Sequence, residues 1–183
     1  MNKPKRLKVE DWLKQALETL DNEGIHKVNV EHLARQLGVT KGSFYWHFKN
    51  HETLIREMLD YWARTLTTNI IERSVQDSND AKEIFLKLIT IITTEKVGRY
   101  ETAIRAYARH NGKARSTIQK VDQQRLQYIT SLFTDMNFTQ ADAEVRARLA
   151  LYYQVAEQGI FLKESKKKLK NLLRQRFEFL TAN

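Results

Sequence analysis

Apolar residues recur at helical spacing along almost the whole of this 183-residue chain. The first apolar stripe predicts a helix that stops at Gly24, and it consists of Val9, Trp12, Leu13, Ala16, Leu17 and Leu20. Asn29 is a good N-cap for a second helix over residues 30–37, which Gly38 closes. Two short helices separated by a tight glycine-containing turn are typical of a helix-turn-helix.

The third predicted helix, from Lys41 to Phe48, is only about two turns long. Thr40 is its expected cap. Phe44 and Phe48 are four residues apart and share one face, which is predicted to be buried. Tyr45 and Trp46 fall on other sides of the helix, where two adjacent exposed aromatic side chains indicate an interaction surface.

The apolar pattern of the remaining sequence predicts further helices. Asn50 caps a fourth helix that starts at His51 and runs to about Arg73 as a bridge to the rest of the chain. A polar loop, residues 76–80, follows this helix, and Asn79 or Asp80 is the expected cap of the next one. The later helices are predicted over residues 81–97, 100–110, 115–135 and 140–163, with one more near the C-terminus.

The composition favours an all-α fold, since the sequence has one proline and six glycines. Cysteine is absent, which excludes disulfides, thiolate metal sites and a cysteine nucleophile and suits a reducing cytosol. No apolar run of about 18 residues and no signal-peptide core occur. We therefore expect a soluble, cytoplasmic protein with no membrane partner.

The formal net charge of +9 suggests a polyanionic partner, but its distribution adds little. Residues 1–64 carry 11 Lys and Arg against 9 Asp and Glu, whereas residues 164–183 carry 6 against 2. The local pattern is more informative. The region of the third helix is rich in hydrogen-bond donors without nearby carboxylates, which suits phosphate oxygens and base edges. The basic residues within 2–8 are interpreted as a solvated terminus, with a DNA-contacting arm as the alternative.

Two apolar stripes near the C-terminus predict a four-helix dimer interface, with two helices from each chain. The alternative is that both stripes close the core of a single chain. Gly159 is expected inside the first of these helices, where close approach of a second helix would explain it. The predicted dimer interface comprises Leu149, Tyr153, Ala156, Gly159, Ile160, Leu169, Leu172, Leu173 and Phe177.

The block VNVEHLARQLGVTKGSFYWHFKNHETL resembles the N-terminal DNA-binding domain of the TetR family of bacterial transcriptional regulators. The resemblance covers roughly residues 9–66, and its strongest part is LGVTKGSFYWHFKN. Asn29 departs from the usual Thr or Ser but keeps the capping role. Asp21 stands where an aromatic residue is common, which affects the expected packing and not the expected function.

The resemblance implies a helix-turn-helix DNA-binding domain at residues 1–50 and a helical effector-binding and dimerisation domain at residues 51–183. It implies a ligand-responsive regulator, a repressor rather than an activator, that binds a near-palindromic operator as a homodimer in the bacterial nucleoid. Lys41, Gly42, Ser43 and Trp46 would then face bases in the major groove. The backbone contacts would come from Thr40, Tyr45, His47 and Lys49.

A small-molecule effector is a further implication, and aromatic residues of the central region are candidates for its pocket. Position by position, ordinary core packing is the alternative. The candidate pocket residues are Phe85, Tyr100, Tyr107, Phe133, Tyr152 and Tyr153. Arg99, Arg105 and Arg109 are expected to face solvent rather than an anionic effector.

No cofactor, no metal and no catalytic role are expected. His47 and His51 are four residues apart, but a helix break separates them, so their faces do not align for a metal ion. The sequence contains neither a phosphate-cradling glycine loop nor a G-x-S-x-G motif. Another class of function stays open, namely a helical adaptor that binds a protein through Tyr45 and Trp46.

Overall fold

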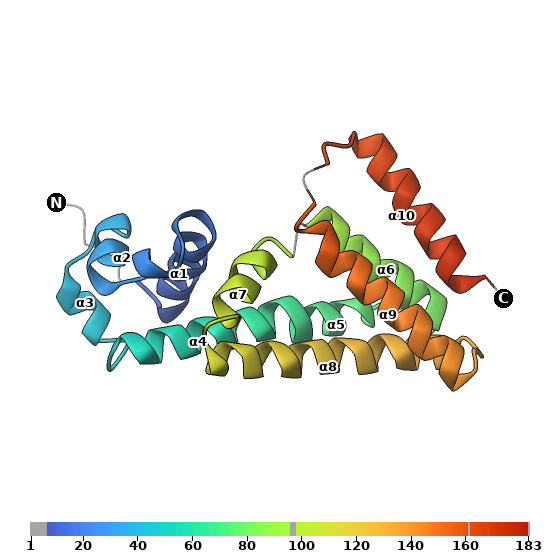
Figure 1. The fold of residues 1–183 in the computed structure, drawn as a ribbon, viewed down its shortest axis with the longest axis horizontal. Helices are drawn as coiled ribbons and strands as arrows, with labels where there is room; N and C mark the ends of the chain where they lie inside the picture. The colour runs from blue at the N-terminus through green and yellow to red at the C-terminus, as the bar shows by residue number, and fades with distance from the viewer. Residues whose placement is uncertain (1–6, 96–97, 161, 183) are drawn as a thin grey trace.

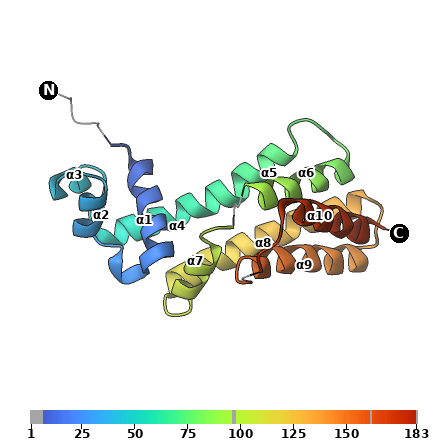
Figure 2. The same ribbon diagram turned by 90° about the horizontal axis from the view of Figure 1, so that it is seen from above.

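The structure is a computed structural model that describes residues 7–95, 98–160 and 162–182, and within these ranges the regular structure is entirely helical. Most of the expected arm at residues 2–8 lies outside the described residues. The helices form an elongated molecule with a small N-terminal unit at one end (Figures 1 and 2). They are α1 (Val9–Glu23), α2 (Val30–Gln36), α3 (Lys41–Tyr45), α4 (His51–Ala63), α5 (Asn69–Ser74), α6 (Ala81–Thr94), α7 (Glu101–Ala108), α8 (Gly112–Asp135), α9 (Gln140–Glu157) and α10 (Lys166–Thr181).

Side-chain caps fix where several helices begin. The side chain of Asn29 accepts a hydrogen bond from the backbone N–H of His32, and that of Asn50 accepts one from Thr53. Asp80 caps α6 in the same way. Each of these caps satisfies a backbone donor that the first turn of a helix leaves free. The predicted capping roles of Asn29 and Asn50 are confirmed.

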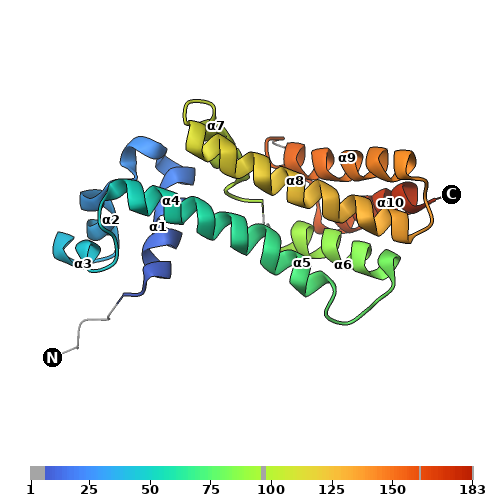
Figure 3. The same ribbon diagram turned by 90° about the horizontal axis from the view of Figure 1, so that it is seen from below.

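Long helices join the N-terminal unit to the rest of the chain. A π-helical turn, Arg64–Thr68, connects α4 to α5, so the predicted helix over residues 51–73 is continuous but not uniform. The 24-residue α8 packs against α4 and runs alongside it (Figure 3). None of the described helices is both long enough and apolar enough to traverse a lipid bilayer.

Two hydrophobic cores lie one after the other along the length of the molecule. The first surrounds Trp12 and includes Ile104 of α7 and Ile118 of α8, in addition to side chains of α1 to α4. The second joins α6, α8, α9 and α10 and includes Phe85 and Phe133, whose ring centroids are 4.9 Å apart. Because Ile104 of α7 is part of the first core, α7 supports the N-terminal unit. The domain division at residue 50 itself stays a prediction.

The C-terminal helices differ from their predicted bounds. Helix α9 ends at Glu157, so Gly159 lies in the turn after the helix and not in its interior. A Cβ atom at Gly159 would have only Ala156 O as a near neighbour, at 3.6 Å. The expectation that Gly159 lies inside a helix is therefore wrong, and no contact within the chain requires glycine there, while its place in a dimer interface stays a prediction. Helix α10 follows a non-helical connection and packs against α6 (Figure 1).

Candidate nucleic-acid interface and central pocket

The α3 region separates buried from exposed aromatic residues as its periodicity predicts. Phe44 and Phe48 are 0% and 1% exposed, and Trp12 lies edge-on to Phe44 with 5.5 Å between ring centroids. Tyr45 and Trp46 are 63% and 89% exposed. A helix too short to be stable alone is thus held by two buried rings. Its two large outward side chains are left free to meet a partner.

A side-chain contact of His51 fixes the segment that follows α3. The side chain of His51 contacts the backbone oxygen of Val28 at 2.5 Å, which ties the start of α4 to the end of the α1–α2 connection. Helix α3 itself is shorter than predicted, because regular α-helix ends at Tyr45 and a turn continues toward Phe48. Thr40 occupies the N-cap position, but its side chain makes no capping hydrogen bond, so the expected side-chain cap is wrong.

The eight residues predicted to contact DNA gather on and around α3. Six of them are exposed, while Ser43 and His47 are half-buried. At Gly42 an added Cβ atom would lie 3.6 Å from Thr40 Oγ1, an ordinary contact. The chain's own packing therefore does not require glycine at this position. The exposed members are Thr40, Lys41, Gly42, Tyr45, Trp46 and Lys49.

Lys41 has an ion-pair partner that the sequence analysis missed. Its ammonium group pairs with the carboxylate of Glu31 on α2, and both side chains are largely exposed. The hydrogen bond from Lys41, and then its charge, lower the pKa of Glu31. Glu31 is therefore ionised and paired near pH 7. The expectation of donors without nearby carboxylates is wrong at Lys41.

We expect Glu31→Ala to tighten binding to a DNA duplex by roughly two- to fivefold, because Lys41 no longer has to leave a carboxylate and one negative charge near the phosphates is removed. Fluorescence anisotropy with a labelled duplex measures the effect. Glu83→Ala, an exposed carboxylate in the first turn of α6, is the control and should leave the affinity unchanged. Weaker binding by the Glu31 variant would contradict a DNA-facing Lys41.

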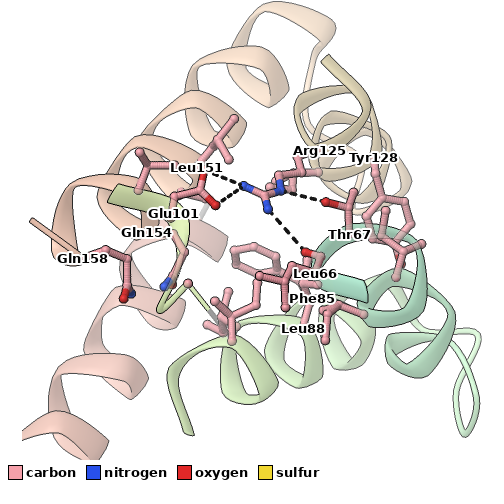
Figure 4. A pocket seen from close by; sticks show the side chains of 18 residues that line it. Leu66, Thr67, Phe85, Leu88, Glu101, Arg125, Tyr128, Leu151, Gln154 and Gln158 are labelled. Carbon is pink, nitrogen blue, oxygen red and sulfur yellow. Dashed lines mark hydrogen bonds and ion pairs between the residues drawn. The ribbon is translucent and has the colours of Figure 1, made fainter. Parts of the chain in front are cut away.

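A second candidate site is a mostly apolar cavity of about 70 Å³ between α5, α6, α8 and α9 (Figure 4). The side chain of Arg125 lies at its polar wall and is 15% exposed. Arg125 donates to Glu101 at 3.1 Å, to Thr67 Oγ1 at 3.1 Å and to the backbone oxygen of Leu66 at 3.4 Å. The last two acceptors belong to the π-helical turn, so the cavity wall is hydrogen-bonded to the connection between α4 and α5.

Only one of the aromatic residues predicted for the effector pocket lines this cavity, and that residue is Phe85. Tyr100 and Tyr107 pack against the first core instead, because α7 lies against α1. Phe133 is fully buried behind Phe85. Tyr152 is 56% exposed on α9. The aromatic side chain at the cavity that the sequence analysis did not select is Tyr128.

Tyr153, also proposed for the pocket, is 43% exposed and outside the cavity lining. Arg105 does not face solvent freely as expected. It donates to Glu101 at 2.8 Å and bonds Asp122 through both terminal nitrogens, at 2.9 and 2.6 Å. Burial alone would lower the pKa of Arg105, but hydrogen bonding to Asp122 and the charge of Glu101 outweigh it and raise that pKa.

The polar wall of the cavity could not be selected from the sequence. Glu101 and Arg105 are four residues apart, a common surface spacing, and nothing local relates them to Arg125. Only the packing of α7 on α8 brings the three charges together. No cluster of three or more His, Asp or Glu side chains suited to a metal ion occurs in the part of the chain that the structure describes.

The predicted dimer residues divide into two groups. Leu149, Tyr153, Ala156 and Ile160 are exposed on or just after α9, and Leu172 is 36% exposed on α10. Leu169 is half-buried, and Leu173 and Phe177 pack against the second core of their own chain. The alternative reading, that the stripes close the chain's own core, therefore fits Leu173 and Phe177 better than the α9 residues.

The fold and the α3 surface together define an all-α protein with an N-terminal helix-turn-helix unit. Residues 13–58 match the sequence profile of bacterial regulatory proteins of the tetR family. Tetracycline repressor protein class C from Escherichia coli is 34% identical over 87 residues, which is 48% of this chain and 36% of the repressor. The class E repressor of the same organism is 36% identical over 50 residues, 27% of this chain and 24% of that protein.

The folds of several solved structures match the fold of this chain over nearly its whole length. A candidate transcriptional regulator from Saccharomonospora viridis, in complex with choline, has a TM-score of 0.77 at 15% identity and 96% coverage of both chains. The fatty acid degradation regulator FadR from Bacillus halodurans has a TM-score of 0.72 at 17% identity, and the match covers 100% of this chain and 98% of FadR. At these identities the likeness concerns the fold alone. The match to the TetR family thus concerns residues 13–58, and the chain spans only about a third or less of the curated repressors it matches.

Proposed function

We propose that this protein is a DNA-binding transcriptional regulator that acts as a homodimer on a near-palindromic operator and responds to a small-molecule effector. The observation that carries the proposal is the outward pair Tyr45 and Trp46 on a helix held by Phe44 and Phe48. The exposed donors Lys41 and Lys49 flank that pair. Donors and aromatic side chains on a short helix suit the major groove of duplex DNA.

The contacts proposed for the bound state are those that the family resemblance implies for the residues on and around α3. Lys41, Gly42, Ser43 and Trp46 lie nearest the bases, and Thr40, Tyr45, His47 and Lys49 grip the phosphate backbone. The phosphate contacts supply affinity that depends on salt, and the base contacts select the sequence. The regulator acts as a repressor in the bacterial cytoplasm. The proposal assigns no catalytic role and no cofactor to any residue.

Dimerisation is part of the proposal because one α3 reaches only a few base pairs. The face of α9 supports it, since large apolar side chains stay exposed there over about two and a half turns. Such contiguous apolar surface is rare on a monomer without a partner. Those side chains are Val145, Leu149, Tyr152 and Tyr153, with exposed fractions of 58%, 51%, 56% and 43%.

Leu149→Glu tests the proposed function through this face. We expect the variant to be monomeric by light scattering, because two carboxylates would be buried near the two-fold axis, and to lose at least a hundredfold in duplex affinity. Gln119→Glu, an exposed change on α8, is the matched control and should stay dimeric and bind normally. A Leu149 variant that is monomeric yet binds the same duplex with unchanged affinity would refute the dimeric mode of action.

A further inference from the structure

The charged groups at the wall of the central cavity already satisfy one another. Glu101 is 3% exposed and accepts hydrogen bonds from both Arg105 and Arg125, at 2.8 and 3.1 Å. Behind this wall, and outside the cavity lining, Arg105 also binds Asp122 through two hydrogen bonds. The two arginines and the two acids sum to zero charge. A charged group brought into the cavity would therefore have to break one of these pairs or stay uncompensated.

The hydroxyl groups at the cavity are also engaged. Thr67 Oγ1 accepts from Arg125 at 3.1 Å, and the hydroxyl of Tyr128 lies 2.9 Å from Ser74 Oγ on α5. These groups are tied to the helices that carry them. They offer little to a ligand without losing a bond within the protein.

One buried donor at the cavity has no partner. Gln154 Nε2, on α9, is almost inaccessible to solvent and makes no hydrogen bond to any of the described residues. Its side chain projects from α9 at the same wall of the cavity as Glu101 (Figure 4). Buried amide donors are normally satisfied. An unsatisfied one in a cavity wall is a site where an acceptor would gain a hydrogen bond at little cost.

Gln158, just after α9, is the other amide side chain of the lining, and the remaining side chains are aliphatic and aromatic. The apolar side chains come from four helices and from the π-helical turn, and they include Leu66, Ile70, Phe85, Leu88, Ile129 and Leu151. They provide burial for a hydrocarbon body but no further polar anchor. A ligand that fits this chemistry is apolar over most of its length and polar at one point.

We infer that the effector is an uncharged, mainly apolar molecule with a single hydrogen-bond acceptor, such as a ketone, ester or amide carbonyl, that takes the bond from Gln154. This inference rests on the proposed function and specifies its effector. The carbonyl oxygen faces Gln154 Nε2, and the hydrocarbon part lies against Phe85 and Leu88. The Glu101–Arg125 pair stays intact.

The size of the cavity links binding to movement. At about 70 Å³ it has roughly half the volume of the engineered cavity of about 150 Å³ that accepts benzene. A ligand with a longer hydrocarbon chain must therefore displace the walls. One of those walls is the π-helical turn, to which Arg125 is bonded and from which α4 leads to the N-terminal unit.

Three probes with eight carbon atoms separate the possible ligand classes, namely 2-octanone, octanoate and octylammonium. We expect isothermal titration calorimetry at pH 7 to detect 2-octanone and to show at least tenfold weaker binding of both ions. Gln154→Met, which keeps the length of the side chain and removes the donor, should weaken ketone binding about tenfold. Gln154→Leu serves as a second variant if the first is unstable. Gln119→Leu, an exposed change on α8, should bind the ketone like the unmodified chain.

Several results would overturn the inference: an ion that binds as tightly as the ketone, an unchanged ketone affinity in a folded Gln154 variant, or no detectable binding of the ketone. Duplex binding is measured on the same samples without any probe. If the unmodified chain binds DNA and the probes fail, only the effector class is wrong. If it does not bind DNA, the regulator proposal fails whatever the probes do.

Discussion

Tyr45→Ala should abolish binding to the operator duplex while leaving a folded dimer. Tyr45 is 63% exposed, and its ring lies edge-on to Phe44 without belonging to the buried cluster. Its proposed role is a hydrogen bond to a phosphate, and hydrogen bonds to charged groups contribute about 1.5–3 kcal/mol each. A dimer loses this contact twice, which corresponds to roughly a hundredfold to ten-thousandfold loss of affinity.

Duplex-binding measurements on variants of the neighbouring residues should give different results from those on the Tyr45 variant. Lys49→Ala should also abolish binding at physiological salt, and at low salt it should reduce the salt dependence of the affinity by about one phosphate contact per chain. Trp46→Ala, at a base-facing position, should change the preferred sequence. Lys82→Ala, at an exposed position in α6, is the control and should change nothing. Circular dichroism and light scattering verify fold and dimer, and full binding by the Tyr45 variant at physiological salt would contradict the assigned surface.

Glu101→Leu should lower the free energy of unfolding by about 3–5 kcal/mol, because it leaves Arg105 and Arg125 without their shared buried acceptor. Arg125 is only 15% exposed, and its guanidinium lies 5.6 Å from the ring centroid of the buried Trp62. Its charge therefore cannot be rehydrated without opening the interface between α4 and α8. Urea denaturation followed by circular dichroism measures the change.

The double variant Glu101→Leu with Arg125→Leu should recover part of the loss, since it removes the cation left without a carboxylate partner, whereas Arg105 keeps its two bonds to Asp122. Glu144→Ala is the matched control, because Glu144 pairs with Arg148 on the exposed face of α9 and should leave the denaturation midpoint nearly unchanged. Equal effects of Glu101→Leu and Glu144→Ala would mean that the cavity wall is not held by this ion pair.

Features that depend on nearby residues could be predicted from the sequence. The burial of Phe44 and Phe48, the exposure of Tyr45 and Trp46, and the cap at Asn50 all follow from spacings of a few residues. Helix periodicity and capping chemistry act over that range. The all-helical fold follows from the same patterns repeated along the chain.

Features that depend on how helices pack could not be predicted. Glu31 reaches Lys41 only because the turn at Gly38 folds α2 back toward α3. Tyr100 and Tyr107 lie against the first core and not at the cavity, because α7 packs on α1. Arg125 and Glu101 are 24 residues apart and meet through two separate helices. Such distant pairs leave no periodic signal in the sequence.

The central claim is that two paired copies of the chain place α3 into the same side of one duplex. Selection of bound fragments from a random DNA pool, followed by sequencing, tests it most directly. We predict an enriched inverted repeat whose half-sites lie at least one helical turn, about 34–36 Å, apart, bound by two chains per duplex. A pool that shows no enrichment, or that yields a single unrepeated site bound by one chain, would contradict the claim.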